Sequence, residues 1–218
     1  MSHPVPGSTP RTRIRRLPDH AVEDRAALHA VLDAGLVGHL AITGADGQPF
    51  VLPVAYARDG ERVLIHGSTG SRLFRGLAAG APTCLTVTLL DGLVLARSAF
   101  ESSMNYRSAM VLGSCTVLPD AEKTAALDLL TDRLLPGRRG DLRPHTTKEL
   151  AATLVLALSL DEASVKISAG PPDDDEADLD APIWAGTVPI TEHFGTPVPA
   201  PDLRFDLPAP NYVGTWTR

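Results

Sequence analysis

The sequence of 218 residues lacks the cysteine pattern of a disulfide-rich or zinc-binding protein. Its two cysteines, Cys84 and Cys115, stand in apolar runs without a CxxC partner, and no cysteine–histidine cluster has zinc spacing. We therefore expect two buried free thiols and no metal site. The sequence also has no apolar run near the ~20 residues that a membrane-spanning helix needs.

An excess of positive charge is absent too. The formal net charge is -6, whereas proteins that bind nucleic acids or membrane surfaces usually carry a basic patch. The basic segment at residues 11–16 can contact a nucleic acid, but a solvated arm is the simpler interpretation. No apolar segment follows it, so it does not resemble a secretory signal. We expect a cytoplasmic protein that binds neither nucleic acid nor membranes.

Several enzyme signatures are missing: the sequence has no GxGxxG motif, no Walker A loop and no GxSxG elbow. Short apolar runs with a period of two, separated by turn signals, instead predict six or seven antiparallel strands with a few connecting helices. This spacing favours a closed or nearly closed barrel. Asp91-Gly92 predicts a hairpin turn, and Asp19 predicts the cap of the first helix.

Composition divides the chain into three parts. Residues 1–18 predict a flexible N-terminal arm, and residues 19–170 carry the strands and helices of the barrel. Residues 171–218 begin with an acidic loop between prolines and continue as a proline-rich extension with few regular patterns. We expect this extension to pack on the barrel or on a partner subunit.

The stretch VLIHGSTGSRLFRGLAAG, residues 63–80, joins a strand, a Gly/Ser turn and a short helix that starts with an arginine. A helix start presents unpaired N–H groups and a positive dipole end, which together bind phosphates and carboxylates. Ser71 can cap the helix, and the guanidinium of Arg72 can bind two phosphate oxygens. The alternative is a plain turn with an exposed arginine.

A second polar cluster lies between two apolar strands, in ARSAFESSMNYRSAM at residues 96–110. It is rich in hydrogen-bonding groups for a hairpin loop and suits a polar, planar ligand, although an exposed loop beside an edge strand is the alternative. His66 ends the strand before the phosphate turn, where it is either structural or titrates against a cofactor. Trp184 stands in the irregular tail and needs a core groove or a ligand ring to cover.

These residues together resemble the flavin-binding split-barrel superfamily that includes pyridoxamine 5′-phosphate oxidase, and especially its branch with the nitroimidazole-resistance reductases. The resemblance runs from about residue 12 to about residue 200. Four stretches carry it, in the family's order: LIHGSTGSRLFRGLAAG, VTLLDGLVLARSAFESSMNYRSAMVLGSCTVL, ATLVLALSLDEASVKISAG and APIWAGTVPI.

The resemblance implies a six-stranded antiparallel split β-barrel with flanking helices, which binds FMN at the interface of a homodimer. Ser71 and Arg72 would hold the FMN phosphate, and Trp184 would cover the flavin or the substrate. A histidine at a strand end like His66 lies beside the substrate pocket in the nitroimidazole-resistance branch. The cofactor site predicted in this way comprises His66, Gly67, Ser68, Ser71, Arg72, Arg97, Ser98, Asn105, Tyr106, Arg107, Ser108 and Trp184.

The predicted function is that of an FMN-dependent oxidoreductase in which the protein binds, orients and tunes the flavin. His66 is the candidate catalytic proton donor, because the intrinsic pKa of histidine lies near neutrality. The arginine and histidine signature with which pyridoxamine phosphate oxidases grip their substrate is missing, which argues against synthesis of pyridoxal phosphate and leaves the substrate class open. A small nitro- or quinone-like acceptor is the favoured substrate class. The alternatives are a barrel that binds flavin or haem for storage or sensing, and an interaction scaffold without a cofactor.

Overall fold

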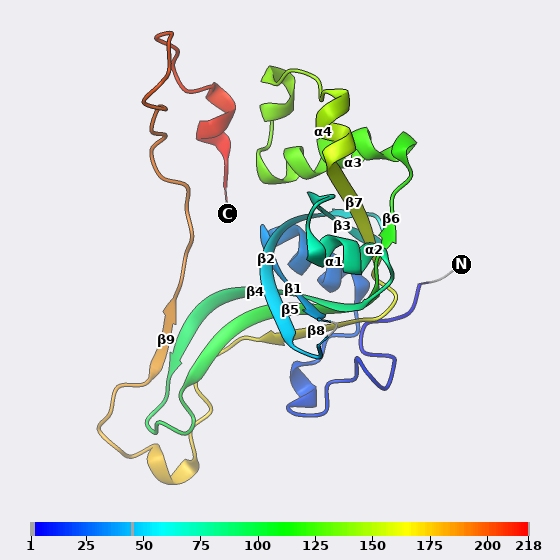
Figure 1. The fold of residues 1–218 in the computed structure, drawn as a ribbon. Coiled ribbons are helices and arrows are strands. Elements are labelled where there is room, and N and C mark those ends of the chain that lie inside the picture. The colour runs from blue at the N-terminus through cyan, green and yellow to red at the C-terminus, as the bar shows by residue number, and fades with distance from the viewer. Residues whose placement is uncertain (1–2, 45, 218) are drawn as a thin grey trace.

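The computed structural model describes residues 3–44 and 46–217, which form a curved antiparallel sheet with helices around it (Figure 1). The order of the strands is β6-β7-β3-β2-β1-β4-β5-β8, and β9 pairs with β4. The strands are β1 (Val37–Thr43), β2 (Pro49–Asp59), β3 (Arg62–Ser68), β4 (Pro82–Leu95), β5 (Ser103–Ser114), β6 (Thr116–Val117), β7 (Thr153–Ser159), β8 (Ala163–Ser168) and β9 (Gly186–Pro189).

Short helices connect these strands. The α-helices are α1 (Arg25–Ala34), α2 (Arg72–Ala78), α3 (Asp120–Leu134) and α4 (Thr147–Ala152). The single 3-10 turns are η1 (Pro18–His20), η2 (Arg138–Asp141), η3 (Glu176–Asp178) and η4 (Asn211–Thr215). The prediction of a mainly β, antiparallel split barrel is confirmed, although the described chain has nine strands and not six.

The core lies inside the curl of the sheet. Alternation along β1 buries Leu40 and Ile42, because successive side chains of a strand point to opposite faces. Helix α1 packs on β2, β4, β5 and β8 and buries Leu28 and Leu32 completely. Each such leucine contributes about 1.5–3 kcal/mol of burial free energy. Tyr56 reaches back from β2 and donates its hydroxyl to the carbonyl of Leu32 at 2.6 Å.

The first helix begins later than the sequence predicts. Asp24 is its cap, and its carboxylate accepts the amides of Ala26 and Ala27 at 3.1 and 3.2 Å. Asp19 lies in the separate turn η1, so the prediction that Asp19 caps the helix is wrong. The chain at Ala21 is extended and bridges to β8, and this keeps the two helical segments apart.

The predicted hairpin at Asp91-Gly92 is also wrong. Strand β4 continues through both residues with a bulge between Leu90 and Gly92, and its hairpin with β5 closes further along. A glycine is needed here because a Cβ at Gly92 would lie 2.9 Å from the carbonyl oxygen of Val188 on β9. Asp-Gly therefore marks a bulge that admits a third strand, and a bulge shares its preferred residues with a turn.

The stretch at residues 154–168 forms two strands, β7 and β8, joined by a tight turn. The hydroxyl of Ser159 donates to the carboxylate of Asp161 at 2.7 Å and accepts the amide of Asp161 at 3.2 Å. This side-chain pairing stabilises the turn that carries the chain from β7, beside β3, to β8, beside β5. It accounts for one of the additional strands.

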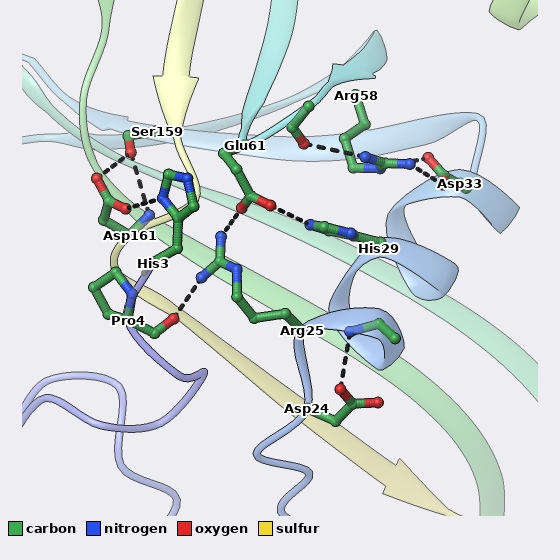
Figure 2. A network of polar contacts seen from close by, with 12 residues as sticks. His3, Pro4, Asp24, Arg25, His29, Asp33, Arg58, Glu61, Ser159 and Asp161 are labelled. Carbon is green, nitrogen blue, oxygen red and sulfur yellow. Dashed lines mark hydrogen bonds and ion pairs between the residues drawn. The ribbon is translucent and has the colours of Figure 1, made fainter. Parts of the chain in front are cut away.

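The N-terminal arm lies against this turn and against α1 (Figure 2). His3 pairs with Asp161 at 3.2 Å, and Arg25 donates to the carbonyl of Pro4 at 2.5 Å. Arg25 also forms an ion pair with Glu61. Met1 and Ser2, at the start of the predicted flexible arm, lie outside the described residues.

Candidate functional site

The turn between β3 and α2 is ordered by its own side chains. The hydroxyl of Ser68 accepts the amide of Gly70 at 3.1 Å, and that of Ser71 accepts the amide of Phe74 at 3.4 Å as the cap of α2. Thr69 donates both its amide and its hydroxyl to the carbonyl of Ala152 at the end of α4. The turn is thus fixed to the barrel before any ligand binds.

Gly67 has a packing role in this turn. A Cβ at this position would lie 2.4–2.6 Å from three ring atoms of Phe74, which is nearly buried. The absence of a side chain therefore lets α2 lie directly on β3. This contact sets the position of the residues that follow Ser71.

Arg72 and Arg75 extend from α2 into solvent. Both are exposed, and no hydrogen bond or ion pair engages either guanidinium among the residues that the structure describes. They are three positions apart, which places them on neighbouring parts of one helix surface. Two unpaired guanidiniums beside an ordered turn can bind one or two phosphate groups.

His66 lies one residue before Gly67, at the point where β3 leaves the ladder with β2. Much of its surface is exposed, and within the described chain its imidazole has no hydrogen-bond or ion-pair partner. The protein atoms around it nevertheless desolvate the ring and lower the pKa of His66 below 6.5. The imidazole is therefore neutral at pH 7 and can accept a proton or bind a metal ion.

The polar cluster between β4 and β5 has internal partners instead. Arg97 is held by Asp174 of the acidic loop, through its amide at 2.5 Å and its guanidinium at 2.8 Å. The hydroxyl of Ser98 accepts the amide of Glu101 at 3.1 Å inside the hairpin turn. These two residues lie at the far end of the β4–β5 hairpin, away from α2 (Figure 1).

Three further predicted residues lie along β5. Asn105 donates to the carbonyl of Gly170 at 2.9 Å, and Arg107 binds both carboxylate oxygens of Asp91 at 2.7 and 2.9 Å. Ser108 donates to the carbonyl of Lys166 on β8 at 3.4 Å. These contacts hold β5 to its neighbouring segments, and the binding roles of the residues stay predictions.

Trp184 does not pack into the core of its own chain. Its side chain is 67% exposed, so the prediction that it fills a core groove is wrong. The ring folds over the backbone of Gly186, where a Cβ would lie 2.9 Å from two of its carbons. Its exposed face is free to cover a ligand or a second protein surface.

The register of the strands shows which side chains share the surface of the sheet opposite the core. Cross-strand partners share a face, so the pairings of β1, β2, β4 and β5 define one uncharged surface opposite the core, which we call the outer face. The part formed by these four strands contains no Asp, Glu, Lys or Arg, and Lys166 of β8, the cross-strand partner of Ser108, lies at its border. Its residues are Val37, His39, Ala41, Val51, Pro53, Ala55, Cys84, Thr86, Thr88, Leu90, Tyr106, Ser108, Met110 and Leu112.

The outer face contains two predicted cofactor residues, Tyr106 and Ser108. His66 borders it, because it has the same orientation on β3 as Leu64, which faces away from the barrel interior. His39 lies at its centre and was missed by the sequence analysis. The signal for His39 was available: it is a histidine at the exposed position of a strand that buries Leu40 and Ile42.

Two cavities of the described chain lie elsewhere. One is lined by Pro6, Arg13 and Glu23 under the N-terminal arm, and the other by Asp59, Arg62 and Thr116 at the far rim of the barrel. Neither is lined by a predicted cofactor residue. Within residues 3–44 and 46–217, no cluster of three His, Cys, Asp or Glu could hold a metal ion, and no helix could span a membrane.

Residues 24–167 match the family described as pyridoxamine 5′-phosphate oxidase. The chain therefore belongs to the pyridoxamine 5′-phosphate oxidase family. A comparison with curated proteins gave no match.

Solved structures resemble the whole chain. The FAD and haem binding protein from Mycobacterium smegmatis is 46% identical, with 91% of this chain and 97% of that chain covered and a TM-score of 0.87. The flavocytochrome Anf3 from Azotobacter vinelandii is 41% identical over 99% of both chains, with a TM-score of 0.91. A candidate 5-nitroimidazole antibiotic resistance protein from Bacteroides thetaiotaomicron shares the fold, at 20% identity, a TM-score of 0.57 and coverage of 67% and 86%.

Proposed function

We propose that this protein is a flavin-dependent redox protein that binds FAD and haem. One observation carries the proposal: among the described residues, the guanidiniums of Arg72 and Arg75 and the neutral imidazole of His66 have no partner, and the turn between β3 and α2 joins the segments that carry them. The two relatives above 40% identity are described as an FAD and haem binding protein and as a flavocytochrome. The first of these names favours FAD over the FMN that the sequence predicts.

Arg72 and Arg75 would bind the phosphates of the flavin. FAD carries a pyrophosphate, whereas FMN carries a single phosphate. Two free guanidiniums can share one phosphate, but a pyrophosphate offers each of them a phosphate group of its own. Ser71 already caps α2 by accepting a hydrogen bond, but its hydroxyl can still donate a hydrogen bond to a phosphate oxygen. These residues would fix the orientation of the flavin, which supplies the electron-transfer chemistry when it is bound.

His66 would serve the haem. A haem iron needs a donor atom from the protein, and the neutral imidazole of His66, which has no partner among the described residues, would supply it. The lowered pKa of His66 also makes it a poor proton donor at pH 7, because little of it is protonated there. We therefore assign His66 to iron binding in preference to the general-acid role that the sequence predicts.

We further propose that the protein is a homodimer that pairs through the outer face. This surface has no charged residue, and Val37, Val51 and Leu90 on it are 43–59% exposed. Depletion of charge is typical of the core of a protein–protein interface, and exposed apolar patches mark such sites. A second copy would cover residues that one chain leaves in contact with water.

The acceptor of the electrons is proposed to be a small nitro- or quinone-like compound. A screen of the FAD-loaded protein with NADH or NADPH and candidate acceptors tests this. Oxidation of the reduced nicotinamide that depends on an acceptor supports turnover. A flavin that stays unreduced with every donor would favour the non-catalytic alternative.

The cofactors are tested by loading. We expect the protein to bind FAD more tightly than FMN in a titration followed by flavin fluorescence; equal affinities would contradict the second phosphate contact. For the haem, His66→Ala and the matched variant His39→Ala are compared by their Soret bands. Loss or displacement of the band in His66→Ala alone is expected, and an unchanged band in that variant would contradict ligation by His66.

A further inference from the structure

The C-terminal extension, residues 190–210, leaves the barrel after β9 and returns to it at η4 (Figure 1). The family match ends at residue 167, so this segment is not part of the shared barrel. Both of its ends are attached to its own chain, and these attachments define where the segment must start and finish.

The first attachment is β9. It pairs with β4 from Gly186 to Pro189, and the amide of Ile190 donates to the carbonyl of Asp91 at 2.9 Å. The ladder therefore extends one residue beyond the strand. From this point the chain runs along the side of β4 and β2 (Figure 1).

The second attachment lies around η2. The indole N–H of Trp216 donates to the carbonyl of Pro136 at 2.9 Å, and the hydroxyl of Tyr212 donates to Asp141 at 2.6 Å. The ring of Trp216 also meets Phe194 edge-on, at a centroid distance of 5.5 Å. Gly137 has a φ of 81°, and a Cβ there would lie 3.1 Å from the ring of Tyr212. The end of the chain is thus specifically docked.

Between these attachments the extension stays exposed, and the ring of Phe194 packs on Trp216 of the same chain. Every residue from 187 to 209 is exposed. From residue 195 to residue 207, the backbone hydrogen bonds among the described residues stay inside the segment: Leu203 donates to Ala200, and Leu207 donates to Phe205. Large apolar side chains nevertheless line it, with Val198 88%, Phe205 73% and Leu207 61% exposed.

The prolines explain how the segment keeps this shape. Pro197, Pro199 and Pro201 alternate with Val198 and Ala200, and prolines fix φ and remove amide donors. Proline-rich segments are extended and semi-rigid, so this one can stand away from the barrel without a ladder of hydrogen bonds. An extended segment with exposed apolar side chains and two docked ends is suited to lie across a surface that its own chain does not offer.

We propose that residues 190–207 form a clasp that lies across a second copy of the chain. The same chain supplies the complementary surface, since its uncharged outer face is exposed on the side of β2 and β4 along which the extension runs. A second copy that packs against that face would lie between the barrel and the extension of the first copy. The clasp rests on the proposed homodimer, and it adds an interface that the barrel alone does not have.

Photo-crosslinking tests the clasp on the full-length protein. Phe205 is replaced by the photoreactive p-benzoylphenylalanine, and Val5 is replaced in the same way as the control. Val5 is 45% exposed on the N-terminal arm, which lies on the opposite side of the barrel from the extension (Figure 1). Irradiation should give a covalent dimer for position 205 and none for position 5. Crosslinks only within one chain would overturn the proposal.

A second measurement gives the energetic effect. We expect Phe205→Asp and Val198→Asp each to raise the dimer dissociation constant about tenfold or more, as buried anchors of an interface do, while Val5→Asp leaves it unchanged. Light scattering of the wild type separates the two hypotheses. A monomeric wild type contradicts the homodimer, whereas a dimer that both Asp variants leave intact contradicts the clasp alone.

Discussion

The β3–α2 turn and the β4–β5 hairpin look alike in the sequence, since both are polar and contain arginine and serine. In the structure they differ in one respect. Arg97 and Arg107 in the hairpin are held by Asp174 and Asp91, whereas Arg72 in the turn has no partner in the described chain. A paired polar residue stabilises the fold, and an unpaired one at an ordered turn is available to a ligand.

Removing the ion pair between Arg97 and Asp174 should have the largest effect on stability. The Asp174 side chain is 2% exposed and that of Arg97 is 26% exposed, so Asp174→Ala leaves a charge without a partner in a mostly dry site. We expect the free energy of unfolding to fall by about 3–5 kcal/mol, measured by urea denaturation. The exposed neighbour Asp175→Ala is the control, with a change below about 0.5 kcal/mol. Equal stabilities for the two variants would show that the pair is not structural.

In the β3–α2 turn, Arg72→Ala should weaken ligand binding and leave stability unchanged, which is the reverse of the effect expected in the hairpin. We expect FAD binding to weaken by about 1.5–3 kcal/mol, the range for a charged hydrogen bond, with the unfolding transition unchanged. Isothermal titration measures the first and denaturation the second. Arg15→Ala, an exposed arginine of the N-terminal arm, should change neither quantity. Unchanged FAD affinity in Arg72→Ala would remove this arginine from the phosphate site.

Arg107→Ala sharpens the comparison, because the sequence places this residue in the cofactor site. Its pair with Asp91 is bidentate, but the two side chains are 39% and 36% exposed and solvent weakens their attraction. We expect a loss of about 0.2–1 kcal/mol in the free energy of unfolding and no change in FAD affinity. Weaker FAD binding at unchanged stability would return Arg107 to the site.

The smallest effect concerns pH. Desolvation lowers the pKa of His66 below its unfolded value of 6.5, so the unfolded chain binds more protons as the pH falls through that value. The contribution of His66 to stability is therefore present above about pH 6.5 and is lost below it. We expect the unfolding free energy of His66→Gln to fall less steeply from pH 7 to pH 5 than that of the wild type. Identical slopes would show that His66 is not desolvated.

The fold was largely predictable because antiparallel strands leave a local signal. Alternation identified β1 and β2, and glycine-containing turns separated them. The number of strands was not predictable from the sequence. Asp91-Gly92 has the residues of a turn, but it forms a bulge inside β4 where β9 approaches. Whether Asp-Gly bends a chain back or admits a third strand depends on a partner far away in the sequence.

The residue types of the candidate site were predictable, but the hydrogen-bond and ion-pair partners of its side chains were not. Asp174 lies 77 residues from Arg97, and no local pattern reveals that the acidic loop neutralises this arginine. The histidine at the centre of the outer face, His39, becomes visible only when the register of four strands is known. Ser71 and Arg72 were found because the whole turn is contiguous in the chain.

The absorbance spectrum of the purified full-length protein tests the central claim most directly. We predict a yellow-brown protein with a flavin band at ~450 nm and a haem Soret band, and release of FAD on denaturation. A colourless protein that takes up neither FAD nor haem when they are added would contradict the account.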